Sequence, residues 1–212
     1  MVPPPSAVAF VTTEHFTLQG ARTAAITDST SRATIFIGSV SAGLVALGLI
    51  AAATRIGAAF YAFGLILLST LSVMGFVTCD RVLQSGIEEL HYAERIARLR
   101  AYYFDFAPEL THYLASVPPP RRLAILGLHS GFWPAFRTTA GMIGVVTAVL
   151  TGSAAGLLAT IAASHPAVAG FVTGGVVGAA ALVALMWFQF SAWVHAHQQR
   201  LFEDEQGRPD AG

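Results

Sequence analysis

Residues Ala167–Phe190 read AVAGFVTGGVVGAAALVALMWFQF, a run of apolar and small side chains without Asp, Glu, Lys, Arg or His. Three further stretches have the same character: Ala33–Ala53, Ala58–Cys79 and Thr138–Ala163. Because a helix rises about 1.5 Å per residue, each stretch is long enough to cross a hydrocarbon core about 30 Å thick. The sequence therefore predicts an all-α, polytopic membrane protein with four transmembrane helices arranged as two hairpins.

The composition agrees with this fold class. Hydrophobic residues make up 54% of the chain and charged residues only 11%, whereas soluble domains usually contain about 25% charged residues. The single cysteine, Cys79, has no intrachain disulfide partner. We expect it to be a small packed residue near a membrane edge.

The distribution of arginine predicts the orientation of the chain in the membrane. All twelve basic residues are arginine, and eleven of them lie outside the two short connections within the hairpins, which contain only Arg55. Since segments on the cytoplasmic side are enriched in Lys and Arg, we expect both termini and the central segment to be cytoplasmic.

A composition rich in Arg, Ala and Gly without lysine is typical of GC-rich bacteria, so the predicted location is the inner membrane. The chain then divides into a tail with a pre-membrane helix, hairpin 1, a cytoplasmic helical segment with a Pro-rich spacer, hairpin 2 and a cytoplasmic tail: residues 1–32, 33–79, 80–137, 138–190 and 191–212.

Three arginines lie just before the third span. Arg121, Arg122 and Arg137 carry guanidinium groups, which bind phosphate oxygens bidentately. Membrane lipids with anionic headgroups are therefore expected partners. The alternative is that these arginines only set the topology. We expect no nucleic-acid partner.

Small residues recur every fourth position in spans three and four. Such a stripe removes side-chain bulk from one helix face and allows two backbones to approach closely. We therefore predict that these spans form a tight antiparallel hairpin. The glycines expected in its interface are Gly144, Gly152, Gly156, Gly170, Gly174 and Gly178.

The segment after span two predicts a long cytoplasmic helix that continues this span. Residues 80–105 contain no proline, and apolar positions recur at helical spacing in two adjacent stripes. This apolar face requires a partner: the pre-membrane segment 16–26, the C-terminal tail or another protomer. We expect residues 1–10 and those after 206 to be disordered. The two stripes are Leu83, Ile87, Leu90, Ala97, Ala101 and Phe104, and Tyr92, Ile96, Leu99 and Tyr103.

Two Glu-x-x-His units are the candidates for a metal site. Glu88 with His91, and Glu109 with His112, each place a carboxylate and an imidazole on one helix face. Two such units with two further glutamates form the ligand set of di-iron carboxylate bundles. The alternative, which we favour, is that these residues lie on solvated helix faces. No cofactor is therefore predicted.

Hydroxyl groups in the spans have two interpretations. They can line a polar pathway in an oligomer, or they can satisfy backbone carbonyls within their own helices. No intramembrane carboxylate, nucleotide-binding loop or catalytic triad stands out, so we expect no enzymatic activity. The hydroxyl residues are Ser39, Ser41, Ser69, Thr70, Ser72, Thr147, Thr151, Ser153 and Thr173.

The stretch Arg81-Val-Leu-Gln-Ser-Gly-Ile-Glu-Glu-Leu90, followed by Arg95-Ile-Ala-Arg-Leu-Arg-Ala-Tyr-Tyr103, resembles uncharacterised multi-span membrane proteins of GC-rich bacteria. The layout of residues 14–105, with a pre-membrane helix, a two-span hairpin and a long trailing helix, is similar to that of SLATT-type effector modules. This resemblance implies a membrane-perturbing or pore-forming effector in bacterial defence.

Three functions therefore remain open. The favoured one is a membrane scaffold or interaction protein without catalytic activity, which self-associates or binds a protein partner through its cytoplasmic helix. The first alternative is an oligomeric pore, channel or membrane-perturbing effector. The second is a di-metal membrane enzyme that uses the two Glu-x-x-His units.

Overall fold

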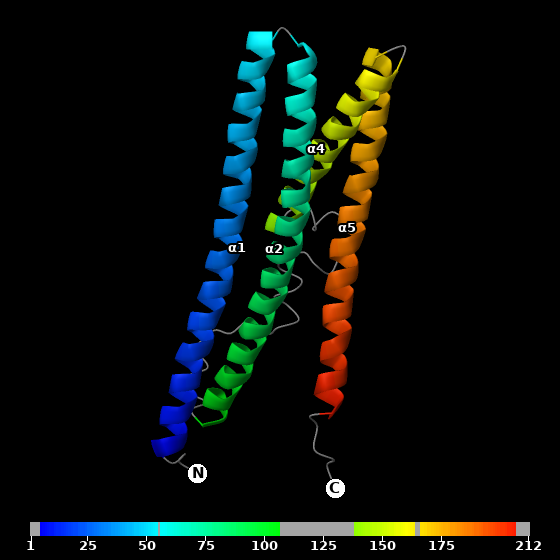
Figure 1. The fold of residues 1–212 in the computed structure, drawn as a ribbon. Helices are drawn as coiled ribbons and strands as arrows, with labels where there is room; N and C mark the ends of the chain where they lie inside the picture. The colour runs from blue at the N-terminus through cyan, green and yellow to red at the C-terminus, as the bar shows by residue number, and fades with distance from the viewer. Residues whose placement is uncertain (1–4, 55, 107–137, 164–165, 207–212) are drawn as a thin grey trace. The chain divides into compact units, whose positions relative to one another are not determined.

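The computed structural model describes residues 5–54, 56–106, 138–163 and 166–206. Throughout these ranges the regular structure is helical (Figure 1). Each helix contains a stretch long and apolar enough to cross a membrane. For the described residues, the prediction of an all-helical chain with four helices apolar enough to span a membrane is thereby confirmed. The helices are α1 (Pro5–Thr54), α2 (Ala58–Phe106), α4 (Thr139–Ala162) and α5 (Pro166–Gln206).

Three of the helices are much longer than a membrane span. Helix α1 has 50 residues, α2 has 49 and α5 has 41, whereas about 20 residues cross the hydrocarbon core. The expectation that residues 1–10 are disordered is wrong from Pro5 onward, because α1 begins there. Proline is well suited to the first helical position, where its missing N–H is not needed. Within the helix, Thr12 and Thr13 donate hydrogen bonds to the carbonyls of Val8 and Ala9, so each hydroxyl is satisfied locally.

The chain forms two compact units. The first contains residues 1–31 and 84–134, and the second contains residues 32–83 and 135–212. In the first unit, the described residues are the N-terminal part of α1 and the C-terminal part of α2. Its buried apolar side chains are Leu18, Ala25, Leu90, Ala93 and Ile96.

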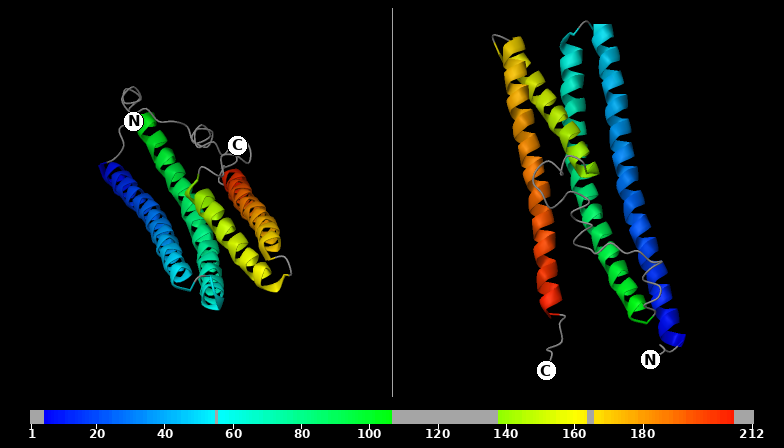
Figure 2. Two further views of the ribbon diagram at one scale, coloured as in Figure 1. Left: turned by 90° about the horizontal axis from the view of Figure 1, so that it is seen from above. Right: turned by 180° about the vertical axis from the view of Figure 1, so that it is seen from behind.

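The second unit contains the remainder of α1 and α2 together with α4 and α5. Phe36 and Met186 are fully buried in it, and Ile143 is 2% exposed. Helices α4 and α5 lie side by side, as all views show (Figures 1 and 2). This unit contains the small-residue stripes and the candidate site described below.

Local sequence signals begin and end the helices of this unit. The Thr138 side chain accepts a 3.0 Å hydrogen bond from the Gly141 N–H, so Thr138 is the N-cap of α4. Pro166 is the first residue of α5. Between α1 and α2, the Gly57 N–H donates to the Thr54 carbonyl over 3.1 Å. Ile56 in this turn has φ 59°, a left-handed conformation that a β-branched residue rarely adopts.

Candidate functional site

The backbones of α4 and α5 are in direct contact. A Cβ atom added to Gly152 would lie 2.5 Å from the carbonyl oxygen of Gly174 and 2.9 Å from the Cα of Gly178. A Cβ atom on Gly156 would lie 2.7 Å from the carbonyl oxygen of Gly170. Because these neighbours are backbone atoms, no side chain can be accommodated without separating the helices.

The glycines of α5 meet α4 in the same way. A Cβ atom on Gly174 would lie 2.9 Å from the Gly152 carbonyl oxygen, and one on Gly178 would lie 3.3 Å from that of Ala148. A Cβ atom on Gly170 would collide with the hydroxyl of Thr160, which donates a hydrogen bond to the Gly156 carbonyl. Five of the six predicted interface glycines therefore lie where the two backbones meet: Gly152, Gly156, Gly170, Gly174 and Gly178.

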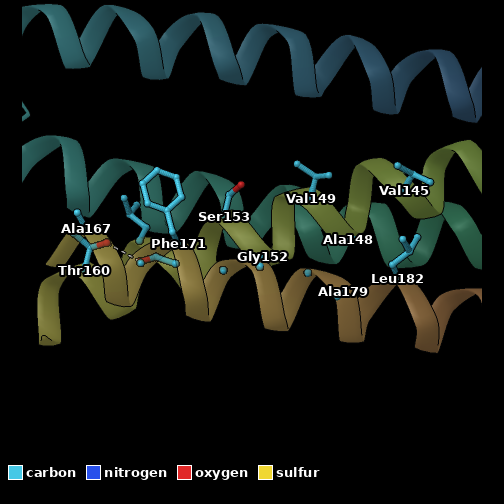
Figure 3. A pocket seen from close by; sticks show the side chains of 16 residues that line it. Val145, Ala148, Val149, Gly152, Ser153, Thr160, Ala167, Phe171, Ala179 and Leu182 are labelled. Carbon is cyan, nitrogen blue, oxygen red and sulfur yellow. Dashed lines mark hydrogen bonds between the residues drawn. The ribbon is translucent and has the colours of Figure 1, made fainter. Parts of the chain in front are cut away.

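A shallow groove of about 600 Å³ runs along this contact (Figure 3). Val145, Val149 and Ser153 line one side of it, and Phe171, Ala179 and Leu182 line the other. Phe171 is 85% exposed. Apart from the hydroxyls of Ser153 and Thr160, the side chains that line the groove are apolar.

The sixth predicted glycine, Gly144, belongs to a separate junction of α2, α4 and α5. A Cβ atom on it would lie 3.2 Å from Nε2 of Gln189 and 3.9 Å from Sγ of Cys79. Gln189 is 1% exposed, and its Nε2 donates a 3.3 Å hydrogen bond to the carbonyl oxygen of Ala140. The same Nε2 lies 3.7 Å from Sγ of Cys79, and that thiol lies 3.5 Å from the Ala140 carbonyl oxygen.

Helix α1 joins this packing one turn before Cys79 on α2. Gly75 of α2 leaves space for Thr147 of α4, which is fully buried and whose hydroxyl a Cβ atom on Gly75 would overlap. The ring of Phe36 from α1 lies against the same glycine, because its Cζ would be 3.0 Å from that Cβ atom. The expectation that Cys79 is a small packed residue fits its place in this core, where it is 1% exposed.

Sequence reasoning missed Gln189 and Gly75. The available signal for Gln189 was an amide side chain in an otherwise apolar stretch, because a polar group at that depth requires a partner. Its partners are distant in the sequence, so no local pattern identifies them. Gly75 is a single glycine without a repeated spacing, and its role depends entirely on the opposite helix.

Most hydroxyls of the spans bond within their own helices. Thr147 donates to the Ile143 carbonyl over 2.8 Å, and Ser72 donates to that of Leu68 over 2.7 Å. This is the second of the two interpretations of these residues, in which a hydroxyl satisfies a carbonyl four residues earlier. The same pattern is found for Ser39, Ser41, Thr70 and Thr151.

The metal candidates lie partly beyond the described residues. The side chains of Glu88 and His91 are exposed on α2, while Glu109 and His112 are outside the described ranges. Within those ranges no group of three or more His, Cys, Asp and Glu side chains is placed to hold a metal ion. The two Glu-x-x-His units therefore stay untested candidates, and the favoured interpretation, that they lie on solvated helix faces, stays a prediction. The lipid-binding candidates Arg121, Arg122 and Arg137 also lie outside the described residues.

Three residues of the predicted apolar stripes on α2 are buried within the chain. Leu83 is 3% exposed, Leu90 9% and Ile96 3%, whereas Ile87 is half-buried. Val82 and Ala93 are also buried, although neither belongs to the predicted stripes.

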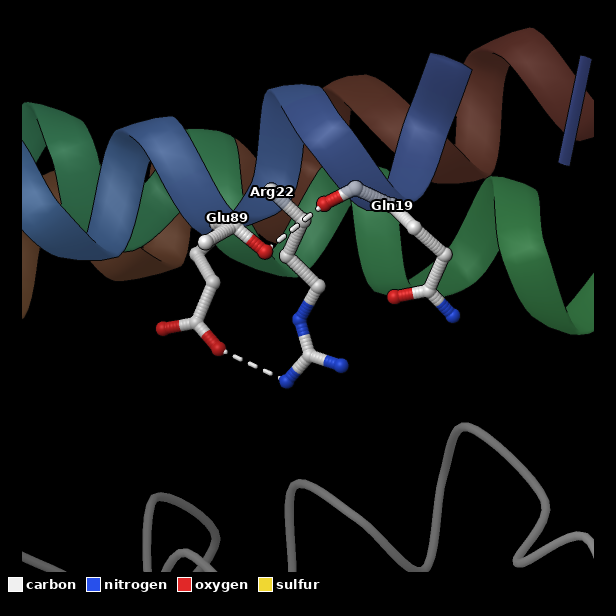
Figure 4. Close-up of polar contacts among 4 residues, drawn as sticks. Gln19, Arg22 and Glu89 are labelled. Carbon is white, nitrogen blue, oxygen red and sulfur yellow. Dashed lines mark hydrogen bonds and ion pairs between the residues drawn. The ribbon is translucent and has the colours of Figure 1, made fainter. Parts of the chain in front are cut away.

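An ion pair between α1 and α2 lies in the described part of the first unit. The Nη2 atom of Arg22 donates a 2.8 Å hydrogen bond to Oε1 of Glu89 (Figure 4). The two side chains are 32% and 37% exposed. Figure 4 also shows Gln19, whose backbone carbonyl accepts a hydrogen bond from the hydroxyl of Thr23 within the same helix. The predicted partner segment 16–26 thus contains a residue that contacts α2.

Comparisons with protein families, with curated proteins and with solved structures find no match to this chain. The resemblance to SLATT-type modules therefore stays a prediction from the layout of the sequence.

Proposed function

We propose that this protein is an integral membrane scaffold of the bacterial inner membrane that self-associates through helical parts outside its spans and has no catalytic activity of its own. In this proposal both termini and the segment after span two face the cytoplasm, as the arginine distribution predicts. Anionic lipids are the expected partners of the arginines before span three.

The observation that carries this proposal is the length of α2. The helix continues from the end of its apolar stretch at Cys79 to Phe106 without interruption, which corresponds to about 40 Å of helix. The N-terminal part of α1 is attached to this extension by the Arg22–Glu89 ion pair. Two helical segments paired in this way offer an extended surface for a partner.

The surface available for association differs from the one that the sequence indicated. Leu83 and Leu90 are buried within the chain, so they serve folding. On the N-terminal part of α1, Phe10 is 75% exposed and Phe16 is 71% exposed. Large aromatic side chains are enriched among the residues that contribute most to protein–protein binding. Phe10 and Phe16 are therefore the proposed contacts between copies.

Native mass spectrometry of the protein in nanodiscs tests this proposal. The wild-type chain is expected as a defined homo-oligomer, and a Phe10→Ser/Phe16→Ser double variant as a monomer. A Thr13→Ala/Thr17→Ala variant is the matched control, because each of these exposed hydroxyls bonds to a carbonyl of its own helix. A monomeric wild-type chain, or an oligomer that the double variant leaves intact, would contradict the proposal.

A pore is the second candidate, and one observation favours it. Ser69, Thr70 and Ser153 lie exposed on the candidate spans, where an assembly of several copies would enclose them. Ion flux through liposomes that contain the wild-type protein, reduced by Ser69→Ala/Ser153→Ala, would support this function. Impermeable liposomes containing the folded protein would exclude it.

A further inference from the structure

The buried polar side chains of the second unit fall into two groups. Ser72, Thr78 and Thr147 are at most 8% exposed, and each donates a hydrogen bond to a carbonyl of its own helix. Gln189 is equally buried, but its contacts are with Ala140 on α4 and Cys79 on α2. Gln189 therefore bonds to neighbouring helices, whereas the buried hydroxyls of Ser72, Thr78 and Thr147 bond within their own.

The residues around Gln189 leave space for its side-chain amide. Gly144 faces Nε2, and a Cβ atom at this position would approach the nitrogen to 3.2 Å. Because Gly144 has no side chain, the amide can cross α4 and reach the Ala140 carbonyl. The Cys79 thiol lies against the same carbonyl at 3.5 Å, so three helices meet at one acceptor.

This contact differs in kind from the remainder of the helix packing. Apolar side chains gain little by leaving lipid tails for a helix interface, because both surroundings are apolar. An amide in the same position has a strong preference for the arrangement that supplies its hydrogen-bond partners. A single polar residue in an apolar interface is known to fix the alignment of helices in this way.

We propose that Gln189 is a polar lock that holds α5 against α2 and α4 and keeps Cys79 inaccessible. The lock lies next to Phe190, the last residue of the apolar stretch, and α5 continues as a helix to Gln206. The inference concerns the conformation of the spans and does not depend on the proposed scaffold function.

The chain provides its own reporter for this lock. Cys79 is its only cysteine, so the rate of labelling by N-ethylmaleimide in nanodiscs measures how often the junction opens. Gln189→Met retains the length of the side chain and removes the amide. We expect it to label roughly three to ten times faster than the wild-type protein, as loss of an interhelical hydrogen bond in a membrane protein predicts.

Two further variants keep the outcome interpretable. Ser191→Ala is the control, because the Ser191 hydroxyl bonds to the Phe188 carbonyl of the same helix. Its labelling rate should equal that of the wild type. Gly144→Ala places a methyl group against the amide and should increase labelling by a smaller factor than Gln189→Met. Labelling of the detergent-unfolded protein gives the upper limit.

If Cys79 in Gln189→Met is labelled as fast as in the unfolded protein, that variant has not folded. Gly144→Ala then tests the lock instead, since this variant retains every polar group. Equal labelling rates in the wild type and in Gly144→Ala would then overturn the lock. When both variants remain folded, a Gln189→Met rate equal to the wild-type rate overturns it directly.

Discussion

The α4/α5 and α1/α2 interfaces of the second unit use glycine in different ways. In the α4/α5 interface, Gly152 faces the carbonyl oxygen of Gly174 and the Cα of Gly178. In the α1/α2 interface, Gly43 faces Cδ1 of Leu71 and Cδ1 of Leu67, at 3.0 and 3.3 Å from its added Cβ atom. The first interface consists of backbone against backbone, and the second of backbone against the ends of leucine side chains.

This difference determines how well each interface tolerates a larger side chain in place of glycine. A leucine end can move by rotation about its side-chain bonds, whereas backbone atoms of a helix move only with the whole helix. Close backbone approach also allows Cα–H groups to contact carbonyl oxygens, a weak attraction that survives in lipid. The α4/α5 interface should therefore be the less tolerant of the two.

The largest expected effect follows from Gly152→Ala. The added methyl group has no space between the two backbones, so we expect destabilisation of about 3 kcal/mol despite the better helix propensity of alanine. Unfolding of the detergent-solubilised protein by added denaturing surfactant measures this change. Gly175→Ala on α5 is the control, because no atom outside its own helix backbone lies within 4 Å of its added Cβ. A Gly152→Ala protein as stable as the control would show that the backbones are not in contact.

A smaller effect is expected from Gly43→Ala. The ends of Leu71 and Leu67 can rotate away from the new methyl group, and the stability should remain within about 1 kcal/mol of the wild type. The same surfactant titration applies, with Gly48→Ala as the reference for a glycine that has no neighbour within 4 Å. Destabilisation equal to that of Gly152→Ala would remove the distinction between the two interfaces.

The smallest effect is expected from the Arg22–Glu89 ion pair of the first unit. Both side chains are about one-third exposed, so solvent and salt screen their attraction, and a coupling energy of about 0.2–1 kcal/mol is expected. A double-mutant cycle with Arg22→Ala and Glu89→Ala measures this coupling, which should decrease as salt is added. A coupling above this range and independent of salt would mean that the pair is shielded from water.

The expected interface glycines illustrate which contacts can be predicted from the sequence. Gly170, Gly174 and Gly178 have a spacing of four, and this spacing places them on one face of a helix whatever the helix packs against. A short connection to the preceding span makes α4 the neighbour of α5. In contrast, the pairing of Gly75 with Thr147 brings together single residues from different helices, for which the sequence contains no pattern.

The apolar stripe of α2 shows a further limit. Its helical spacing correctly indicated that Leu83, Leu90 and Ile96 pack, but the sequence left open whether their partner was this chain or another. Only the tertiary structure shows them buried within the chain. This result moves the proposed association surface to the exposed Phe10 and Phe16.

The sequence by itself determined that the chain is helical and has four stretches able to cross a membrane, because length, hydropathy and residue spacing are local properties of a helix in lipid. The tertiary structure decided what each helix face contacts. Gln189 finds Ala140 and Cys79 only because α2, α4 and α5 converge at Gly144. Hydrogen bonding and close packing depend on the relative positions of atoms from separate helices, and a linear pattern does not contain those positions.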